Sequence, residues 1–251
     1  MNPRLLLVED DAVTAAFLAQ ALAPLRLQLV LAGDLAQARA RVDGREALWL
    51  FDARLPDGRG DGLLAELRAR GYTVPALALT AEDDPAALAG LRAAGFAAVL
   101  AKPITAAALR RALEAAMSAP ARPHGATSAT TAPIPRDDED DDDAAARAVP
   151  PPWDDAAALS ALGGDPAAVQ ALRGLFLKEL PAQSAAVEVA WSGRDDARLR
   201  EQLHRLKASC AFVGAGALLG AVRALHARPD DAGAHARFQA EARALADAAA
   251  A

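Results

Sequence analysis

Carboxylates stand at two places in this sequence where they could take part in chemistry. Glu9, Asp10 and Asp11 stand in a row near the amino terminus, and Asp52 directly follows an apolar run. Carboxylates held close together repel one another, and a bound divalent cation relieves that repulsion. Oxygen ligands of this kind suit Mg²⁺, which keeps several waters and bridges carboxylates to phosphate. Asp52 would then be a nucleophile that forms an acyl phosphate.

A hydroxyl and a cation add to the set of residues that could transfer a phosphoryl group. Thr80 ends another apolar run, and Lys102 follows the last one. The ammonium group of Lys102, together with Mg²⁺, would neutralise charge on the phosphoryl group. The hydroxyl of Thr80 could donate a hydrogen bond to a phosphate oxygen. Each residue also has an ordinary explanation on its own, since Asp11 and Thr80 could cap helices and Lys102 could lie on the surface.

The elements that would bring these residues together are five short apolar runs. Between amphipathic stretches of helical length, they occupy residues 4–8, 27–31, 47–51, 74–80 and 97–101. Continuous apolar character indicates burial on both faces of a strand, as in a parallel sheet. The pattern predicts an α/β fold with a doubly wound, five-stranded parallel sheet. Because ligands bind at the carboxyl ends of such strands, the acidic row, Asp52, Thr80 and Lys102 should meet at one edge.

This block resembles the receiver domain of two-component response regulators over residues 4–117. The resemblance rests on four motifs: VEDD (8–11), FDARLPDGRGDG (51–62), ALTA (78–81) and AKP (101–103). It implies a flavodoxin-like fold with Mg²⁺ as the cofactor. The site residues that it implies are Asp52 as phospho-acceptor, Asp10 as a direct and Glu9 as an indirect Mg²⁺ ligand, the backbone carbonyl of Arg54 as a further ligand, and Thr80 and Lys102 as contacts of the phosphoryl group.

One position departs from the receiver family. The family often has an aromatic switch residue three positions before the lysine, where this sequence has Val99. The coupled movement of a threonine and an aromatic ring is therefore not expected here. The departure bears on how a signal would leave the domain and leaves the phosphotransfer chemistry untouched.

Residues 118–152 have the composition of a linker. Pro, Ser, Thr and Gly are abundant, and a run of seven acids occupies residues 137–143. Such a segment buries too little apolar surface to offset its ordering entropy, and its charges repel one another. The sequence therefore predicts a receiver-like domain at 1–117, a disordered acidic and Pro-rich linker at 118–152 and a helical domain at 153–251.

The C-terminal block has no strand pattern. Helical stretches are predicted at 154–162, 165–179, 182–192, 195–213, 217–227 and 231–249. Short connections between amphipathic helices predict an all-α antiparallel bundle.

His204 lies in the fourth of these helices, beside an apolar stripe. The stripe consists of residues spaced by four and three positions: Leu199, Leu203, Leu206, Cys210 and Val213. Successive helical residues are about 100° apart, so His204 lies off the stripe that faces the core. A reachable imidazole that titrates near neutrality can attack phosphorus, and Lys207 would offset the phosphate charge. A plain exposed histidine is the alternative.

This helix resembles the phospho-accepting helix of histidine phosphotransfer (HPt) domains. The matching residues are His204, Leu206, Lys207, Ser209, Phe212 and Gly214, and residues 162–181 resemble the first long helices of that family. The resemblance implies that His204 is the phospho-histidine. The family usually has glycine after the lysine, where Ala208 stands here, and the added methyl could slow docking or change the choice of partner. The remaining histidines and the one cysteine are given no chemical role: His124, His226, His235 and Cys210.

Composition narrows the class of protein further. The net charge of −6 argues against a nucleic-acid partner. The longest uncharged apolar run, residues 211–222, is too short to span a bilayer, so no membrane association is expected. A single cysteine rules out an internal disulfide and favours a reducing, cytoplasmic setting.

The leading hypothesis is a phosphorelay protein that carries phosphoryl groups on Asp52 and His204. It would pass them between a separate histidine kinase and other receiver or HPt proteins. No Gly-rich phosphate loop occurs, so the chain is not expected to be a kinase itself. The alternative is an interaction module whose bundle binds a kinase without accepting phosphate, which Ala208 and Val99 favour. Whether Asp52 and His204 exchange phosphate within one chain is left open by the sequence.

Overall fold

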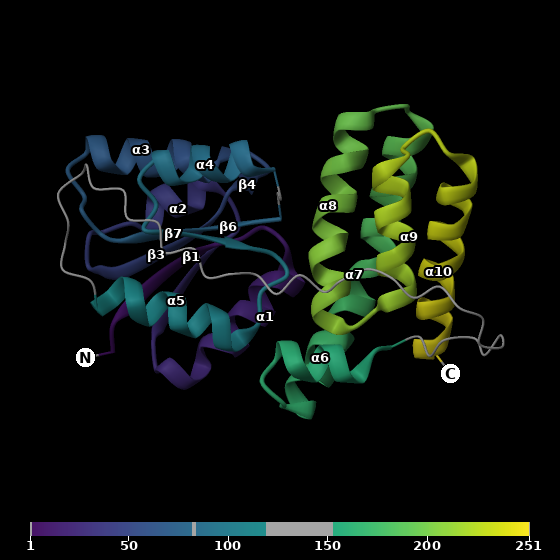
Figure 1. The fold of residues 1–251 in the computed structure, drawn as a ribbon, viewed down its shortest axis with the longest axis horizontal. Helices are drawn as coiled ribbons and strands as arrows, with labels where there is room; N and C mark the ends of the chain where they lie inside the picture. Colours follow the sequence, from purple (N-terminus) through teal and green to yellow (C-terminus); the bar gives the residue numbers. More distant parts are fainter. Residues whose placement is uncertain (1, 82–83, 119–152, 251) are drawn as a thin grey trace.

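Two domains lie side by side in the computed structural model, which describes residues 2–81, 84–118 and 153–250 (Figure 1). The first is an α/β domain, residues 2–118, and the second is a helical domain, residues 153–250. The predicted linker lies outside the described residues, except for Ser118, which ends the last helix of the α/β domain.

Five parallel strands form the sheet of the α/β domain in the order β2-β1-β3-β6-β7. Their bounds are β1 Arg4–Val8, β2 Gln28–Ala32, β3 Glu46–Asp52, β6 Ala76–Thr80 and β7 Ala98–Ala101. The five predicted strands and their parallel pairing are therefore confirmed. A further hairpin, β4 Arg54–Leu55 with β5 Gly58–Arg59, was not predicted, because two-residue strands are too short to show a period.

Helices cover both faces of this sheet (Figure 1). One face carries α1 Ala12–Leu22, which continues into the short η1 Ala23–Leu25, and α5 Ala106–Ser118; the other carries α2 Leu35–Arg41, α3 Gly60–Ala69 and α4 Pro85–Ala93. Alternate residues of β1 belong to different cores: Leu5 and Leu7 pack with α1 and α5, whereas Leu6 packs with the helices of the other face. The unbroken apolar run of the strand is explained by burial on both sides.

The helical domain packs α7, α8, α9 and α10 around one core, with α6 against α7 and α8. The helices are α6 Asp155–Ala161, α7 Pro166–Ser192, α8 Asp196–Val213, α9 Gly216–Ala227 and α10 Ala232–Ala250. The predicted break between 165–179 and 182–192 is wrong, because α7 runs through Pro181. Proline removes one amide donor, but the helix continues since Leu180 and Val187 remain buried on its inner face.

Gly214 ends α8 in a conformation that only glycine adopts easily. Its φ is 74°, in the left-handed region, and its amide donates back to Cys210. A Cβ at this position would lie 2.2 Å from the carbonyl oxygen of Asp154, so a side chain would also displace the start of α6.

Contacts between the two domains run from α1 to α7 and α8. The apolar core on the α1 face of the sheet is continuous with the core of the helical domain, and Phe17 of α1 meets Phe212 of α8 where they join. The two domains therefore share a desolvated interface as well as polar contacts.

Candidate functional site

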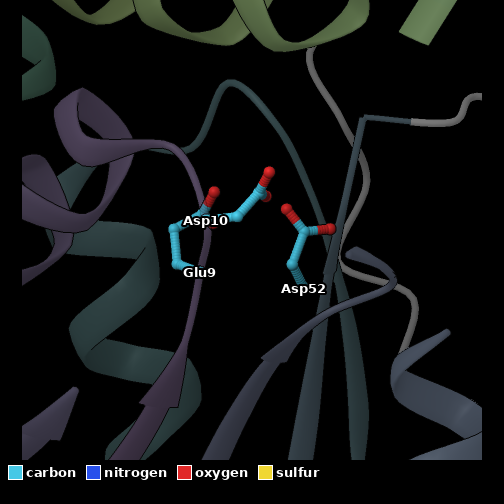
Figure 2. A group of neighbouring side chains, drawn as sticks. All are labelled: Glu9, Asp10 and Asp52. Carbon is cyan, nitrogen blue, oxygen red and sulfur yellow. The ribbon is translucent and has the colours of Figure 1, made fainter. Parts of the chain in front are cut away.

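Three carboxylates gather where β1 and β3 end. Glu9 and Asp10 follow β1, and Asp52 ends the neighbouring strand β3. One oxygen from each lies within 4.8 Å of the others. Figure 2 shows the side chains of Asp10 and Asp52 turned toward each other with Glu9 beside them. The sheet thus brings together acids that are far apart in the sequence, as the sequence predicts.

Lys102 lies in the same cluster. Its Nζ is 2.6 Å from Oδ2 of Asp52 and 2.6 Å from Oε2 of Glu9, and its side chain is only 5% exposed. Burial lowers the pKa of Lys102, but the carboxylates of Asp52 and Glu9 outweigh burial and raise it overall. Lys102 therefore stays charged and compensates part of the negative charge. The Lys102–Pro103 peptide bond is cis.

Burial disfavours the charged form of two acids in the cluster, Glu9 and Asp10. Burial raises the pKa of Glu9 well above its usual range, against the lowering effect of Lys102. Burial also raises the pKa of Asp10, against the lowering effect of Arg205. A divalent cation would relieve this repulsion, and three carboxylate oxygens are the hard ligands that Mg²⁺ prefers. The donor set therefore fits a Mg²⁺ site made of Glu9, Asp10 and Asp52.

The other predicted residues of the α/β domain border this cluster. The backbone amide of Arg54 donates to Oδ1 of Asp52 at 3.0 Å, so the backbone of Arg54 lies beside that carboxylate. Thr80 ends β6, next to β3, and is buried. Gly60, at the start of α3, packs so closely that a Cβ there would be 2.3 Å from the carbonyl oxygen of Asp52. The close approach of α3 helps to hold the end of β3 in place.

Comparison with known proteins agrees with this geometry. Residues 5–114 match the family model described as the response regulator receiver domain. The α/β domain is a receiver domain. Receiver domains act in two-component signalling through phosphorylation of an aspartate.

The relatives described next each match less than half of this chain. The chain is 38% identical over 103 residues to the transcriptional regulatory protein DpiA of Escherichia coli (strain K12), across 40% of this chain and 46% of that protein. It therefore spans less than half the length of this curated relative. Among solved structures, the HemR receiver domain from Leptospira biflexa is 29% identical with a TM-score of 0.45 and covers 49% of this chain and 100% of its own. The receiver domain of an HD domain-containing protein from Pseudomonas fluorescens Pf-5 is 29% identical with a TM-score of 0.42, over 47% of this chain and 95% of its own.

Val99, the departure from the family, lies in β7 and is half-buried. It packs against the core on the face of the sheet that carries α2, α3 and α4. No helix in the described part of the chain is long and apolar enough to cross a membrane.

His204 of α8 faces the receiver domain. The predicted core stripe from Leu199 to Val213 is buried, and His204 lies off it and is half-buried. Burial lowers the pKa of His204 to about 4; Asp52 acts in the opposite direction, and Lys102, Arg54 and Lys207 lower it further. The charges of Asp52, Lys102 and Arg54 in the receiver domain therefore act on this imidazole. At neutral pH the ring is uncharged, so that a ring nitrogen keeps a free electron pair.

Contacts from α8, just after His204, and from α7 join the helical domain to the acidic row of the receiver domain. Nη1 of Arg205 is 3.1 Å from Oδ2 of Asp10. The buried Ser209 donates a hydrogen bond of 2.8 Å to Oδ1 of Asp11, and Gln183 of α7 donates to Oδ2 of Asp11 at 3.1 Å. Asp11 also caps α1 by accepting from the amide of Thr14, so its capping role is confirmed together with a second role in docking.

A second stripe on α8 was missed by the sequence analysis. Arg205, Ser209 and Phe212 are spaced by four and three residues, and each contacts the receiver domain. Ala208 lies close to this stripe, opposite the core stripe, and is nevertheless only 4% exposed. The sequence feature that could have indicated this surface is Phe212, an aromatic residue that lies off the core stripe of α8.

Proposed function

We propose that the chain is a phosphorelay protein in which Asp52 of the receiver domain and His204 of the helical domain exchange a phosphoryl group. The observation that carries the proposal is the docking of α8 on the receiver domain, which brings the imidazole of His204 under the influence of Asp52, Lys102 and Arg54. Phosphate would enter from a histidine kinase or a phosphorylated partner and leave to other receiver or HPt proteins. Mg²⁺ would be held by Glu9, Asp10, Asp52 and the backbone carbonyl of Arg54.

Transfer of the phosphoryl group from Asp52 to His204 requires an uncharged imidazole as the nucleophile. A ring nitrogen of neutral His204 attacks the phosphorus of the acyl phosphate on Asp52. The N–P bond forms, the P–O bond to Asp52 breaks, and its electron pair returns to the carboxylate. The second ring nitrogen keeps its proton, and the same path run backward returns the phosphoryl group to Asp52. A Mg²⁺ ion held by Asp10, Asp52 and their neighbours would compensate charge on the phosphoryl oxygens.

Each neighbouring residue has a distinct part in this proposal. The ammonium group of Lys102 lies 2.6 Å from Oδ2 of Asp52, so it would stabilise the negative charge of a phosphoryl group on Asp52. Thr80 provides a hydroxyl at the end of the adjacent strand for a phosphoryl oxygen. Lys207, whose charge acts on His204, compensates phosphate on the imidazole.

Two substitutions test the proposal on the full chain. With a small phosphodonor and Mg²⁺, Asp52→Asn is expected to abolish labelling. His204→Gln is expected to keep labelling on Asp52 and to remove the acid-labile phosphohistidine pool. If Asp52→Asn labels as well as wild type, the assignment of Asp52 is wrong. If wild type never forms an acid-labile pool from any phosphorylated receiver, the alternative of a bundle that binds without accepting phosphate is supported instead.

A further inference from the structure

Arg205 binds two carboxylates that belong to different domains. Its Nη1 lies 3.1 Å from Asp10 of the receiver domain, and its Nη2 lies 2.6 Å from Glu201 one turn earlier on α8. The side chain of Arg205 is 29% exposed, whereas the side chain of Asp10 is 10% exposed. Asp10 therefore has its negative charge compensated by a cation from outside its own domain.

The same carboxylate belongs to the cluster that fits a divalent cation. Asp10 is within 4.8 Å of its partners Glu9 and Asp52, and Lys102 already lies against both of these. A cation ligated by Asp10 would bring two positive charges next to the guanidinium of Arg205. At separations of a few ångströms and partial burial, like charges repel appreciably.

We propose that Arg205 makes docking of the helical domain and cation binding by the receiver domain compete for Asp10. This inference rests on the proposed function, because it takes Asp10 as a ligand of Mg²⁺. When the domains are docked, Arg205 neutralises part of the negative charge of Asp10, which would otherwise attract the cation. Because coupling between two binding events is reciprocal, a bound cation weakens the hold of Arg205 on Asp10 by the same factor.

Glu201 is a second carboxylate that can pair with the guanidinium of Arg205 when Arg205 leaves Asp10. Arg205 can leave Asp10 and keep its ion pair with Glu201 on its own helix, so release from the receiver domain does not strand a charge. The remaining contacts to Asp11 and Phe17 do not involve the carboxylate of Asp10. A bound cation can therefore weaken the contact between Arg205 and Asp10 without removing the other contacts of the interface. Arg205, which directly follows His204, thereby lowers the affinity of the metal site for a cation.

The test is calorimetric titration of the full chain with MgCl₂ at constant ionic strength, without phosphodonor. Arg205→Gln is expected to bind Mg²⁺ about three- to tenfold more tightly than wild type, since the competing charge is gone. Arg205→Lys keeps the charge and is expected to stay near the wild-type affinity. Arg200→Gln is the matched control, because it removes one positive charge from an exposed position of the same helix, and no change is expected.

Two other outcomes would overturn the inference in distinguishable ways. If Arg205→Gln binds Mg²⁺ with wild-type or weaker affinity while Asp10→Asn binds much more weakly, the metal site stands and the competition is wrong. If Asp10→Asn binds Mg²⁺ as wild type does, Asp10 is not a ligand, and the metal site in the proposed function is wrong as well.

Discussion

The phenyl ring of Phe17 in α1 lies against that of Phe212 in α8, with ring centroids 3.9 Å apart and planes 11° from parallel. Both side chains are fully buried. Phe17 belongs to the receiver domain and Phe212 to the helical domain, so neither domain buries its ring alone. The pair anchors the interface at which His204 faces the neighbourhood of Asp52.

Loss of this anchor should destabilise the whole chain. Phe212→Ala is expected to lower the free energy of unfolding by about 3–5 kcal/mol, because truncating a buried aromatic ring loses its transfer free energy and leaves a cavity. The measurement is urea denaturation of the full chain, followed by circular dichroism. Val189→Ala, at an exposed position of α7, is the control and should change the free energy by less than about 0.5 kcal/mol. A change below about 1 kcal/mol for Phe212→Ala would mean that the rings do not share a packed interface.

Gly60 should matter for phosphorylation of Asp52 although it carries no functional group. A Cβ at Gly60 would lie 2.3 Å from the carbonyl oxygen of Asp52, so Gly60→Ala must shift the end of β3 or the start of α3. Displacement of a reacting group by about 1 Å can cost a hundredfold in rate, and labelling of Asp52 by a small phosphodonor is expected to slow by roughly tenfold or more. Gly62→Ala is the matched control, since a Cβ there meets nothing within 4 Å. Equal labelling rates for the two variants would contradict this role of Gly60.

Ala208 should tolerate no larger side chain if α8 docks on the receiver domain. The residue lies opposite the core stripe of α8 and is only 4% exposed, so a bulky group there would press against the other domain. Ala208→Leu is expected to keep labelling on Asp52 and to reduce transfer to His204 at least tenfold, as measured by the acid-labile pool. Ala197→Leu, at an exposed position of the same helix, should leave transfer unchanged. Normal transfer in Ala208→Leu would show that this face of α8 is not covered during the reaction.

The lowered pKa of His204 predicts a pH dependence of stability with a definite sign. An unfolded chain protonates this imidazole near pH 6.5, whereas the folded chain does so only near pH 4. The unfolded state thus binds more protons in between, and stability falls as the pH falls from about 6.5 toward 4, by at most about 1.4 kcal/mol per pH unit. Urea denaturation at pH 7.5 and pH 5 should show a larger loss for wild type than for His204→Gln. Equal losses would mean that the folded chain does not lower the pKa of His204.

The sequence predicted the receiver domain well because its signals are local. Apolar runs buried on both faces identify β1, β3 and β6, and the carboxyl ends of parallel strands place Asp10, Asp52 and Lys102 together without any knowledge of side-chain packing. The hairpin of β4 and β5 was missed since it is too short for a pattern. The break at Pro181 was expected from local propensity and was overridden by burial of the helix on both sides of the proline.

The interface between the domains could not be predicted in the same way. Arg205, Gln183 and Phe17 carry no motif of their own, and their role depends on which surface of the other domain they meet. Ser209 and Phe212 were noted as part of a resemblance, without a contact to assign. The assignment of residues 153–251 to the HPt family, and the role of His204, stay predictions, although the helical fold of the described part of this region is compatible with them.

The most direct test of the central claim is the time course of phosphate on the full chain at several protein concentrations. Wild-type protein is labelled on Asp52 by a small phosphodonor with Mg²⁺, freed of the donor, and sampled for the acid-stable acyl phosphate and the acid-labile phosphohistidine. If Asp52 and His204 exchange phosphate within one docked chain, the acid-labile pool appears with a rate constant that does not change with protein concentration. A rate that rises in proportion to concentration, or the absence of any acid-labile pool, would contradict transfer within the chain.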